Sequence, residues 1–143
     1  MIRRAQLSDA AAIAELAGQL GYPTDPDEMQ HRLSKMLHDP QRTILVAEVD
    51  GKVVGWTTIK VEAELTQSPY GLVSGLVVDE RHRGRGIGQE LLEAAENWAA
   101  EQGLARLRLR ANEIREDAHR FYLRNEFEMK KKQCQFEKEL GRE

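Results

Sequence analysis

The spacing of apolar residues in the middle of the chain predicts β-structure. Residues 43–49 read TILVAEV and residues 52–65 read KVVGWTTIKVEAEL, with Asp50-Gly51 between them. An Asp-Gly pair between two β-prone runs is typical of a tight hairpin turn, because the turn needs positive φ angles. We therefore expect an antiparallel hairpin here, followed by a third strand over YGLVSGLVV at residues 70–78.

Other parts of the chain carry apolar residues every three or four positions, which is typical of amphipathic helices. Ser8 or Asp9 offers an N-cap for a first helix that Gly21 ends, and Asp25-Pro26 begins a second. A third helix follows residue 86 and ends at Gly103, and a fourth covers REDAHRFYLRN. The expected inward-facing residues of the first three helices are Ile13, Leu16, Ala17, Leu20, Met29, Leu33, Met36, Leu37, Ile87, Leu91, Ala95, Trp98 and Ala99.

Three further segments complete the predicted sheet: MIRRAQL at the start, LARLRLRA at residues 104–111 and MKKKQCQFEKEL at residues 129–140. The order of elements is then βααβββαβαβ. This order predicts an α/β (α+β) fold with a mixed, mostly antiparallel central sheet. A chain of 143 residues suits one domain over 1–143.

Composition narrows the class of protein. Hydrophobic residues make up 41% of the chain, enough for a packed core, and the net charge is −3. A negative charge disfavours general nucleic-acid binding, and the chain lacks an apolar run of the roughly 20 residues needed to cross a membrane. With Cys134 as its one cysteine and no signal-peptide pattern, we expect a cytoplasmic protein without an internal disulfide.

The most informative stretch is RHRGRGIGQ, residues 81–89, between the third strand and the third helix. Unpaired N–H groups at a helix start attract anions, glycines let the backbone approach a phosphate, and arginines add charged donors. The alternative is a plain tight turn with solvated arginines. Neither the P-loop spacing nor the dinucleotide-binding G-x-G-x-x-G spacing is present.

Two motifs in this chain resemble the GNAT superfamily of N-acetyltransferases. Arg83, Gly86 and Gly88 match the family pattern Q/R-x-x-G-x-G/A of the acetyl-CoA site. The segment AHRFYLRNEF, residues 118–127, is similar to the family's A-x-x-F/L-Y-x-x-x-G-F. In two places the chain departs from the family: Glu126 replaces a glycine, and Ser74-Gly75 replaces an acidic residue that is common before the pyrophosphate loop.

The resemblance implies the GNAT fold, with about 6–7 strands and about 4 helices. It also implies an acetyl-CoA-dependent N-acetyltransferase, in which an amine attacks the thioester directly in a ternary complex. Tyr122 is the implied general acid for the departing thiolate. Glu62 or Glu64, two residues apart on a predicted strand, could act as a base through water. The implied acetyl-CoA-binding residues are Leu76, Val77, Val78, Arg83, Gly84, Arg85, Gly86, Ile87, Gly88, Gln89 and Asn112.

Other functions remain open. Tyr122 could instead pack on the sheet through its ring, and the chain could be a GNAT-like module that senses acyl-CoA without catalysis. The stretch RHRGRG suggests RNA binding, which the net charge of −3 opposes. No metal is expected, because neither the histidines nor Cys134 have metal-ligand spacing. The acceptor is an unidentified amine of a small molecule or peptide, and a homodimer is compatible with the family.

Overall fold

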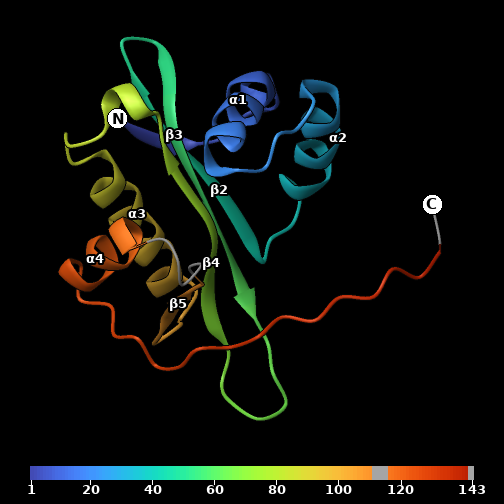
Figure 1. Cartoon of the computed structure of the whole chain (residues 1–143), viewed down its shortest axis with the longest axis vertical. Coiled ribbons are helices and arrows are strands. Elements are labelled where there is room, and N and C mark those ends of the chain that lie inside the picture. Colours follow the sequence, from blue (N-terminus) through green and yellow to red (C-terminus); the bar gives the residue numbers. More distant parts are fainter. Residues whose placement is uncertain (111–115, 142–143) are drawn as a thin grey trace. The chain divides into compact units, whose positions relative to one another are not determined.

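The structure is a computed structural model that describes residues 1–110 and 116–141. The chain divides into two compact units, Met1–Arg110 and Ala111–Glu143, which are described separately. The first unit contains five strands and three α-helices, and the described residues of the second contain one helix (Figure 1). The strands are β1 Ile2–Arg4, β2 Arg42–Val49, β3 Lys52–Glu62, β4 Tyr70–Val78 and β5 Leu107–Leu109. The helices are α1 Ala10–Leu20, α2 Pro26–Met36, α3 Ile87–Glu101 and α4 Glu116–Arg124.

The strands form one sheet in the order β1-β2-β3-β4-β5. All neighbours are antiparallel except β4 and β5, which run parallel. The hairpin predicted at Asp50-Gly51 is confirmed, with φ angles of 51° and 77° at the two turn residues. The mixed, mostly antiparallel sheet with flanking helices is also confirmed.

The helices cover both faces of the sheet: α1 and α2 lie on one side and α3 on the other (Figure 1). Ile13 of α1 and Leu33 of α2 pack on Ile44 and Val46 of β2, with Trp56 of β3 beside them. On the opposite face, Ala95 and Ala99 of α3 pack on Ile59 and Val73. Helix boundaries follow the predicted signals, since Gly21 takes φ 103° and the Asp25 carboxylate accepts a hydrogen bond from Asp27 N at 3.0 Å.

The predicted closing strand at residues 129–140 is wrong. The structure has no strand among residues 126–141, and residues 128–141 are exposed. The five-stranded sheet of the described residues is therefore smaller than expected. A strand is stabilised by pairing with a neighbour, and local sequence cannot supply that neighbour. This segment also carries three consecutive lysines at 130–132 instead of a continuous apolar face.

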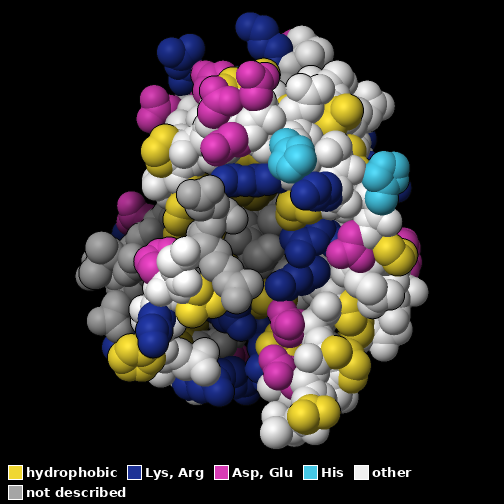
Figure 2. Space-filling view, turned by 90° about the vertical axis from the view of Figure 1, so that its right-hand side faces the viewer, with side chains coloured by type: hydrophobic (Ala, Val, Ile, Leu, Met, Phe, Trp, Pro, Cys, Tyr) yellow, Lys and Arg dark blue, Asp and Glu magenta, His cyan; other side chains and the backbone are white. Residues whose placement is uncertain are grey.

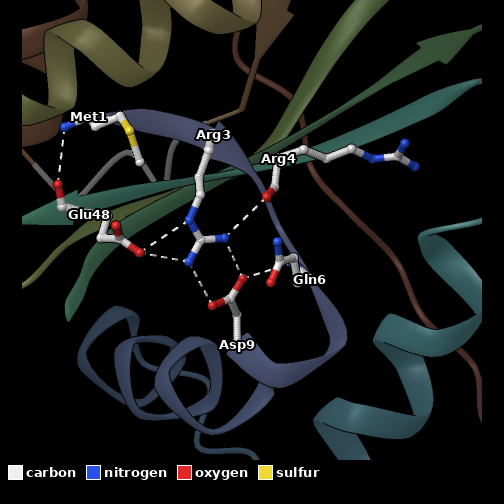
Figure 3. Close-up of polar contacts among 6 residues, drawn as sticks. All are labelled: Met1, Arg3, Arg4, Gln6, Asp9 and Glu48. Atoms are coloured by element: carbon white, nitrogen blue, oxygen red, sulfur yellow. Dashed lines mark hydrogen bonds and ion pairs between the residues drawn. The ribbon is translucent and has the colours of Figure 1, made fainter. Parts of the chain in front are cut away.

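A charged network joins the first strand to the first helix and to β2 (Figure 3). The guanidinium of Arg3 donates two hydrogen bonds to the Asp9 carboxylate, at 2.8 and 3.0 Å, and two to Glu48 Oε1, at 3.0 and 3.2 Å. Asp9 also accepts a hydrogen bond from Gln6 N at 2.7 Å. The Arg3 hydrogen bonds hold the pKa of Asp9 below its ordinary value. Asp9, expected from sequence only as a helix cap, is thus the centre of an ion-pair network.

No helix within residues 1–110 or 116–141 is long and apolar enough to cross a membrane.

Candidate functional site

The junction of β4 and α3 has the backbone geometry that the glycine stretch predicted. Gly84 and Gly86 adopt φ angles of 80° and 81°, in the left-handed region that glycine tolerates best. Gly86 is the N-cap of α3, and no side chain caps that helix end. The N–H groups of the first turn, from Ile87 to Gln89, therefore face outward with the positive end of the helix dipole. Buried Ile87 anchors the turn to the core.

The two arginines of the stretch are placed differently from each other. Arg83 folds back, and its Nε donates a hydrogen bond to the carbonyl of Val78 at 3.1 Å. Arg85 lies between the two left-handed glycines and is exposed. Arg83 thus fixes the end of β4 as well as adding positive charge, whereas the position of Arg85 leaves it accessible to an anion.

Side chains that the sequence reasoning missed also hold this loop. Asp79 Oδ2 lies 2.8 Å from His82 Nδ1, and Asp79 Oδ1 accepts a hydrogen bond from Gln19 Nε2 at 2.9 Å. Gln19 Oε1 in turn accepts from Glu80 N at 3.0 Å, so α1 is tied to the loop. The hydrogen bonds from Gln19 and His82 lower the pKa of Asp79. The Asp-x-x-His spacing of residues 79–82 could have predicted the contact between these two side chains, but no sequence pattern points to Gln19.

The strand β4 contains a bulge at the predicted place. Thr58 pairs with Gly75 and Ile59 pairs with Val73, so Ser74 is the extra residue between them. The buried hydroxyl of Thr57 donates a hydrogen bond to the carbonyl of Gly75 at 2.7 Å. A bulge interrupts the ladder and re-aims the backbone, which is why bulges recur beside functional sites.

Gly75 has a packing reason to be glycine. A Cβ at this position would lie 2.7 Å from Cζ3 of the Trp56 ring, closer than such atoms approach. We expect Gly75→Ala to destabilise the protein by about 1–3 kcal/mol, because the indole must shift within a packed core.

Chemical denaturation of the Gly75→Ala variant measures this loss. Gly18→Ala is a suitable comparison, because a Cβ at that helical glycine meets nothing within 4 Å. It should be neutral or stabilise by up to about 1 kcal/mol. Equal stability of the two variants would show that the Trp56 contact is not restrictive.

The second half of β4 has an open edge. β5 pairs with β4 only from Gly71 to Val73, so the described strands leave the later residues of β4 unpaired on that side. Asp79 N donates to Val54 O of β3 at 2.7 Å. Because peptide groups alternate along a strand, Val77 also faces β3, while Leu76 and Val78 face the open edge. Of the three residues predicted to bind an extended ligand, only Leu76 and Val78 therefore present their N–H groups to that edge.

The candidate bases lie at the far end of β3. The strand ends at Glu62, so Glu64 lies in the following loop and not on the strand as predicted. Glu62 Oε2 is 3.4 Å from Lys60 Nζ. Closer to the bulge, Thr58 Oγ1 is buried, with no hydrogen-bond partner in the described part of the chain. Such an atom costs about 1–3 kcal/mol unless water or a ligand satisfies it.

In the second unit, Tyr122 lies on α4 and is half-buried. Its ring makes edge contacts with Phe121 and Phe127, at centroid distances of 5.5 and 6.0 Å. Glu126 takes φ 69°, the left-handed conformation that the glycine of the family motif would adopt. The turn is therefore kept despite the substitution. Asn112 lies outside the described residues.

Within the described ranges, no group of three or more His, Cys, Asp or Glu side chains could hold a metal ion.

Comparison with known proteins agrees with these features. The sequence model of the acetyltransferase (GNAT) family matches residues 10–127. An aminoglycoside N(6')-acetyltransferase type 1 of Stenotrophomonas maltophilia is 32% identical over 111 residues, which cover 74% of this chain and 71% of that protein. An aminoalkylphosphonate N-acetyltransferase of Salmonella typhimurium strain LT2 is 38% identical over 89 residues, or 62% of this chain and 58% of that protein.

A solved aminoglycoside N-acetyltransferase in complex with CoA has a TM-score of 0.82 to this chain. It is 18% identical, and the match covers 97% of this chain and 99% of that chain. The likeness at this identity concerns the fold alone, and it confirms the fold predicted from the sequence motifs.

Proposed function

Since the chain belongs to the acetyltransferase (GNAT) family and is accordingly an N-acetyltransferase, we propose that it transfers the acetyl group of acetyl-CoA to a primary amine of a small molecule or peptide. The β4–α3 junction carries this proposal. An uncapped helix start, two left-handed glycines and an exposed arginine suit a pyrophosphate, and the open edge of β4 beside them suits an extended pantetheine arm.

Each part of acetyl-CoA has a proposed partner on the chain. The N–H groups of Ile87, Gly88 and Gln89, with Arg85, bind the pyrophosphate. The peptide groups of Leu76 and Val78 pair with the pantetheine arm as an added strand would, and an N–H beside the bulge polarises the thioester carbonyl. Gly84 and Gly86 supply the backbone conformation that brings these donors together.

The transfer itself is a direct displacement in a ternary complex. The amine nitrogen attacks the thioester carbon, a C–N bond forms, and the C–S bond breaks. The departing thiolate takes its proton from the Tyr122 hydroxyl. The proton of the amine leaves through water, and Glu62 is a better candidate than Glu64 to receive it because it lies within β3.

The same proposal treats residues 1–143 as one functional domain, because the family match at residues 10–127 extends across both compact units.

Replacing Tyr122 with phenylalanine tests the proposed acid. We expect Tyr122→Phe to lower kcat by about tenfold or more, because the general acid is removed. The Kd for acetyl-CoA should hardly change, because the ring and its contacts with Phe121 and Phe127 remain.

Steady-state release of CoA and calorimetric binding of acetyl-CoA measure the two quantities. Tyr22→Phe serves as the matched control, because Tyr22 is exposed at 70% and its hydroxyl lies outside the proposed machinery. A Tyr122→Phe enzyme as fast as wild type would remove Tyr122 from the mechanism.

The competing function is an acyl-CoA sensor without catalysis, which the Ser74-Gly75 departure from the family pattern favours. A screen of amines that reports free CoA separates the two. Acetyl-CoA binding without CoA release for any amine would support the sensor.

A further inference from the structure

We propose that the acceptor carries an anionic group, and that a row of cationic side chains across the sheet, Arg42, Lys60 and Arg108, binds it. This inference rests on the proposed function and names the acceptor class: a primary amine that also bears a carboxylate, phosphonate or phosphate. The three residues come from β2, β3 and β5, and we call them the cationic row.

The strand register places the cationic row on one line. Arg42 pairs with Lys60, Lys60 pairs with Leu72, and Leu72 pairs with Arg108. Directly paired residues project from the same face of a sheet, and neighbouring strands lie about 4.8 Å apart. The three long side chains therefore leave the same face along a line about 15 Å long.

The cationic row lies on the face that α1 and α2 only partly cover. Trp56, Thr58 and Lys60 alternate on that face by the two-residue period of a strand, and Trp56 packs in the cluster beneath α1 and α2. The side chains of the row are half-buried instead of covered. Figure 2 looks onto this side of the molecule, and Lys and Arg side chains gather across its middle.

The row is also close to the proposed reaction centre. Lys60 is two residues, or about 7 Å, from Thr58, which pairs with Gly75 at the bulge. A small molecule can span that distance with its amine and its anionic group a few bonds apart. Thr58 Oγ1, which is buried and has no hydrogen-bond partner in the described part of the chain, lies beside the bulge and offers a hydrogen bond to a ligand there.

In the described part of the chain, carboxylates neutralise the row only in part. Arg42 Nε has only a long contact with Asp39 Oδ2, at 3.8 Å, and that nitrogen is buried without a hydrogen-bond partner in residues 1–110 and 116–141. Lys60 Nζ has one carboxylate partner, Glu62 at 3.4 Å.

Neutral groups hold Arg108. Its guanidinium donates to Gln67 Oε1 at 2.6 Å and lies 4.3 Å from the centroid of the Tyr70 ring. Arg106 adds a further cation nearby, bound to Gln67 and Ser68. Among the described residues, these four cations have two carboxylate partners, Asp39 and Glu62, in a chain whose net charge is −3. An anion gains charge-assisted hydrogen bonds here, while an acceptor with several ammonium groups is repelled.

A purely structural role accounts for part of the arrangement. Arg106 and Arg108 fasten the loop between β3 and β4 through Gln67 and Ser68, which would stabilise the fold without any ligand. This structural role does not account for Arg42 and Lys60. They lie on β2 and β3, on the other side of β4 from Arg108, and none of the hydrogen bonds just described joins them to that loop. Lys60 is therefore the residue that separates binding from stability.

The test compares wild type with Lys60→Gln on four amine acceptors. β-Alanine and 2-aminoethylphosphonate carry an acidic group, 3-aminopropanol has a similar length but no acidic group, and spermidine is a longer polyamine. We expect the kcat/KM of wild type to be about tenfold or more higher for the two acidic amines than for 3-aminopropanol, because each charged hydrogen bond to the anion adds affinity. In Lys60→Gln the ratio of kcat/KM for the acidic amines to kcat/KM for 3-aminopropanol should fall by about tenfold, mainly through a higher KM for the acidic amines. A preference of wild type for either acidic amine would support the cationic row and show which acidic group, carboxylate or phosphonate, it binds better.

Lys52→Gln is the matched control, because Lys52 is an exposed lysine at the other end of the same strand. It should behave as wild type. Equal use by wild type of the acidic amines and of 3-aminopropanol, or preference for spermidine, would overturn the cationic row while leaving the acetyltransferase intact.

A second readout does not need turnover. Calorimetry of 2-aminoethylphosphonate and β-alanine with wild type should show saturable binding that Lys60→Gln weakens about tenfold. If no amine releases CoA, the proposed function fails, and this titration still decides the subsite. Absence of saturable binding of both compounds would overturn it.

Discussion

Gly86→Glu should weaken acetyl-CoA binding by about 100-fold or more. Gly86 caps α3 at φ 81°, and nothing lies within 4 Å of the direction a side chain would take. A glutamate there adds a negative charge at the N–H groups proposed to bind the pyrophosphate, and it repels the phosphates directly. A loss of 100-fold corresponds to about 2.7 kcal/mol, the scale of one or two charge-assisted hydrogen bonds. Isothermal titration with acetyl-CoA measures it.

The other end of α3 supplies the control. Gly103 takes φ 78° and also has open space around its Cβ direction, so Gly103→Glu introduces the same kind of backbone strain 17 residues further along the chain. Both variants should lose about 1–2 kcal/mol of stability from that strain. Only Gly86→Glu should lose affinity. Unchanged binding in Gly86→Glu would contradict the proposed pyrophosphate site and everything placed around it.

Asp9→Ala should lower the free energy of unfolding by about 3 kcal/mol. Asp9 is 7% exposed, and its removal leaves the partly buried guanidinium of Arg3 with one carboxylate partner, Glu48, and the Arg4 carbonyl. Breaking a buried ion pair from one side is costly because the remaining charge stays desolvated. Arg3 retains 24% exposure, which moderates the cost. The melting temperature should fall by roughly 10 °C.

The same carboxylate gives stability a defined pH dependence. The pKa of Asp9 is lowered in the folded state, first by the hydrogen bonds from Arg3, relative to its ordinary value of 3.8. Its stabilising effect is therefore complete well above pH 3.8 and is lost as the pH falls through that value toward the folded pKa. Unfolding measured between pH 6 and pH 3 should show this loss in wild type, and Asp9→Asn should lack it.

Glu128→Ala provides a contrast for the Asp9 result. Glu128 also has a lowered pKa, through Lys130 at 2.8 Å, but both side chains are exposed. Exposed pairs contribute little, so the free energy of unfolding of the variant should be close to that of wild type. A similar loss of stability in Asp9→Ala and Glu128→Ala would mean that burial does not increase the contribution of the Arg3–Asp9 pair.

Features that depend on neighbouring residues in the sequence could be predicted. The turn at Asp50-Gly51, the helix end at Gly21 and the left-handed glycines of the β4–α3 junction all follow from backbone preferences within a few residues. The bulge at Ser74-Gly75 was also foreseeable, because glycine inside a strand signals an irregularity.

Features that depend on pairing across the fold could not be predicted. The segment at 129–140 has strand-forming residues, yet no periodicity reveals whether a partner strand exists. The partners of Arg108 are Gln67 and the Tyr70 ring, which lie about 40 residues earlier in the chain and which only the folded sheet brings to it. The alignment of Arg42 with Lys60 also required the register of the whole sheet.

The extra residue at Ser74 restricts how this strand can change over evolution. It reverses the facing of β4, so that Leu72 lies on the α1 and α2 side while Leu76 and Val78 pack with Ile87 beneath α3. Deletion of one residue between Leu72 and Leu76 would restore simple alternation and turn Leu76 and Val78 to the face of Leu72, away from Ile87 and α3. We therefore expect homologous sequences to vary here by replacement and to keep the length of the strand constant.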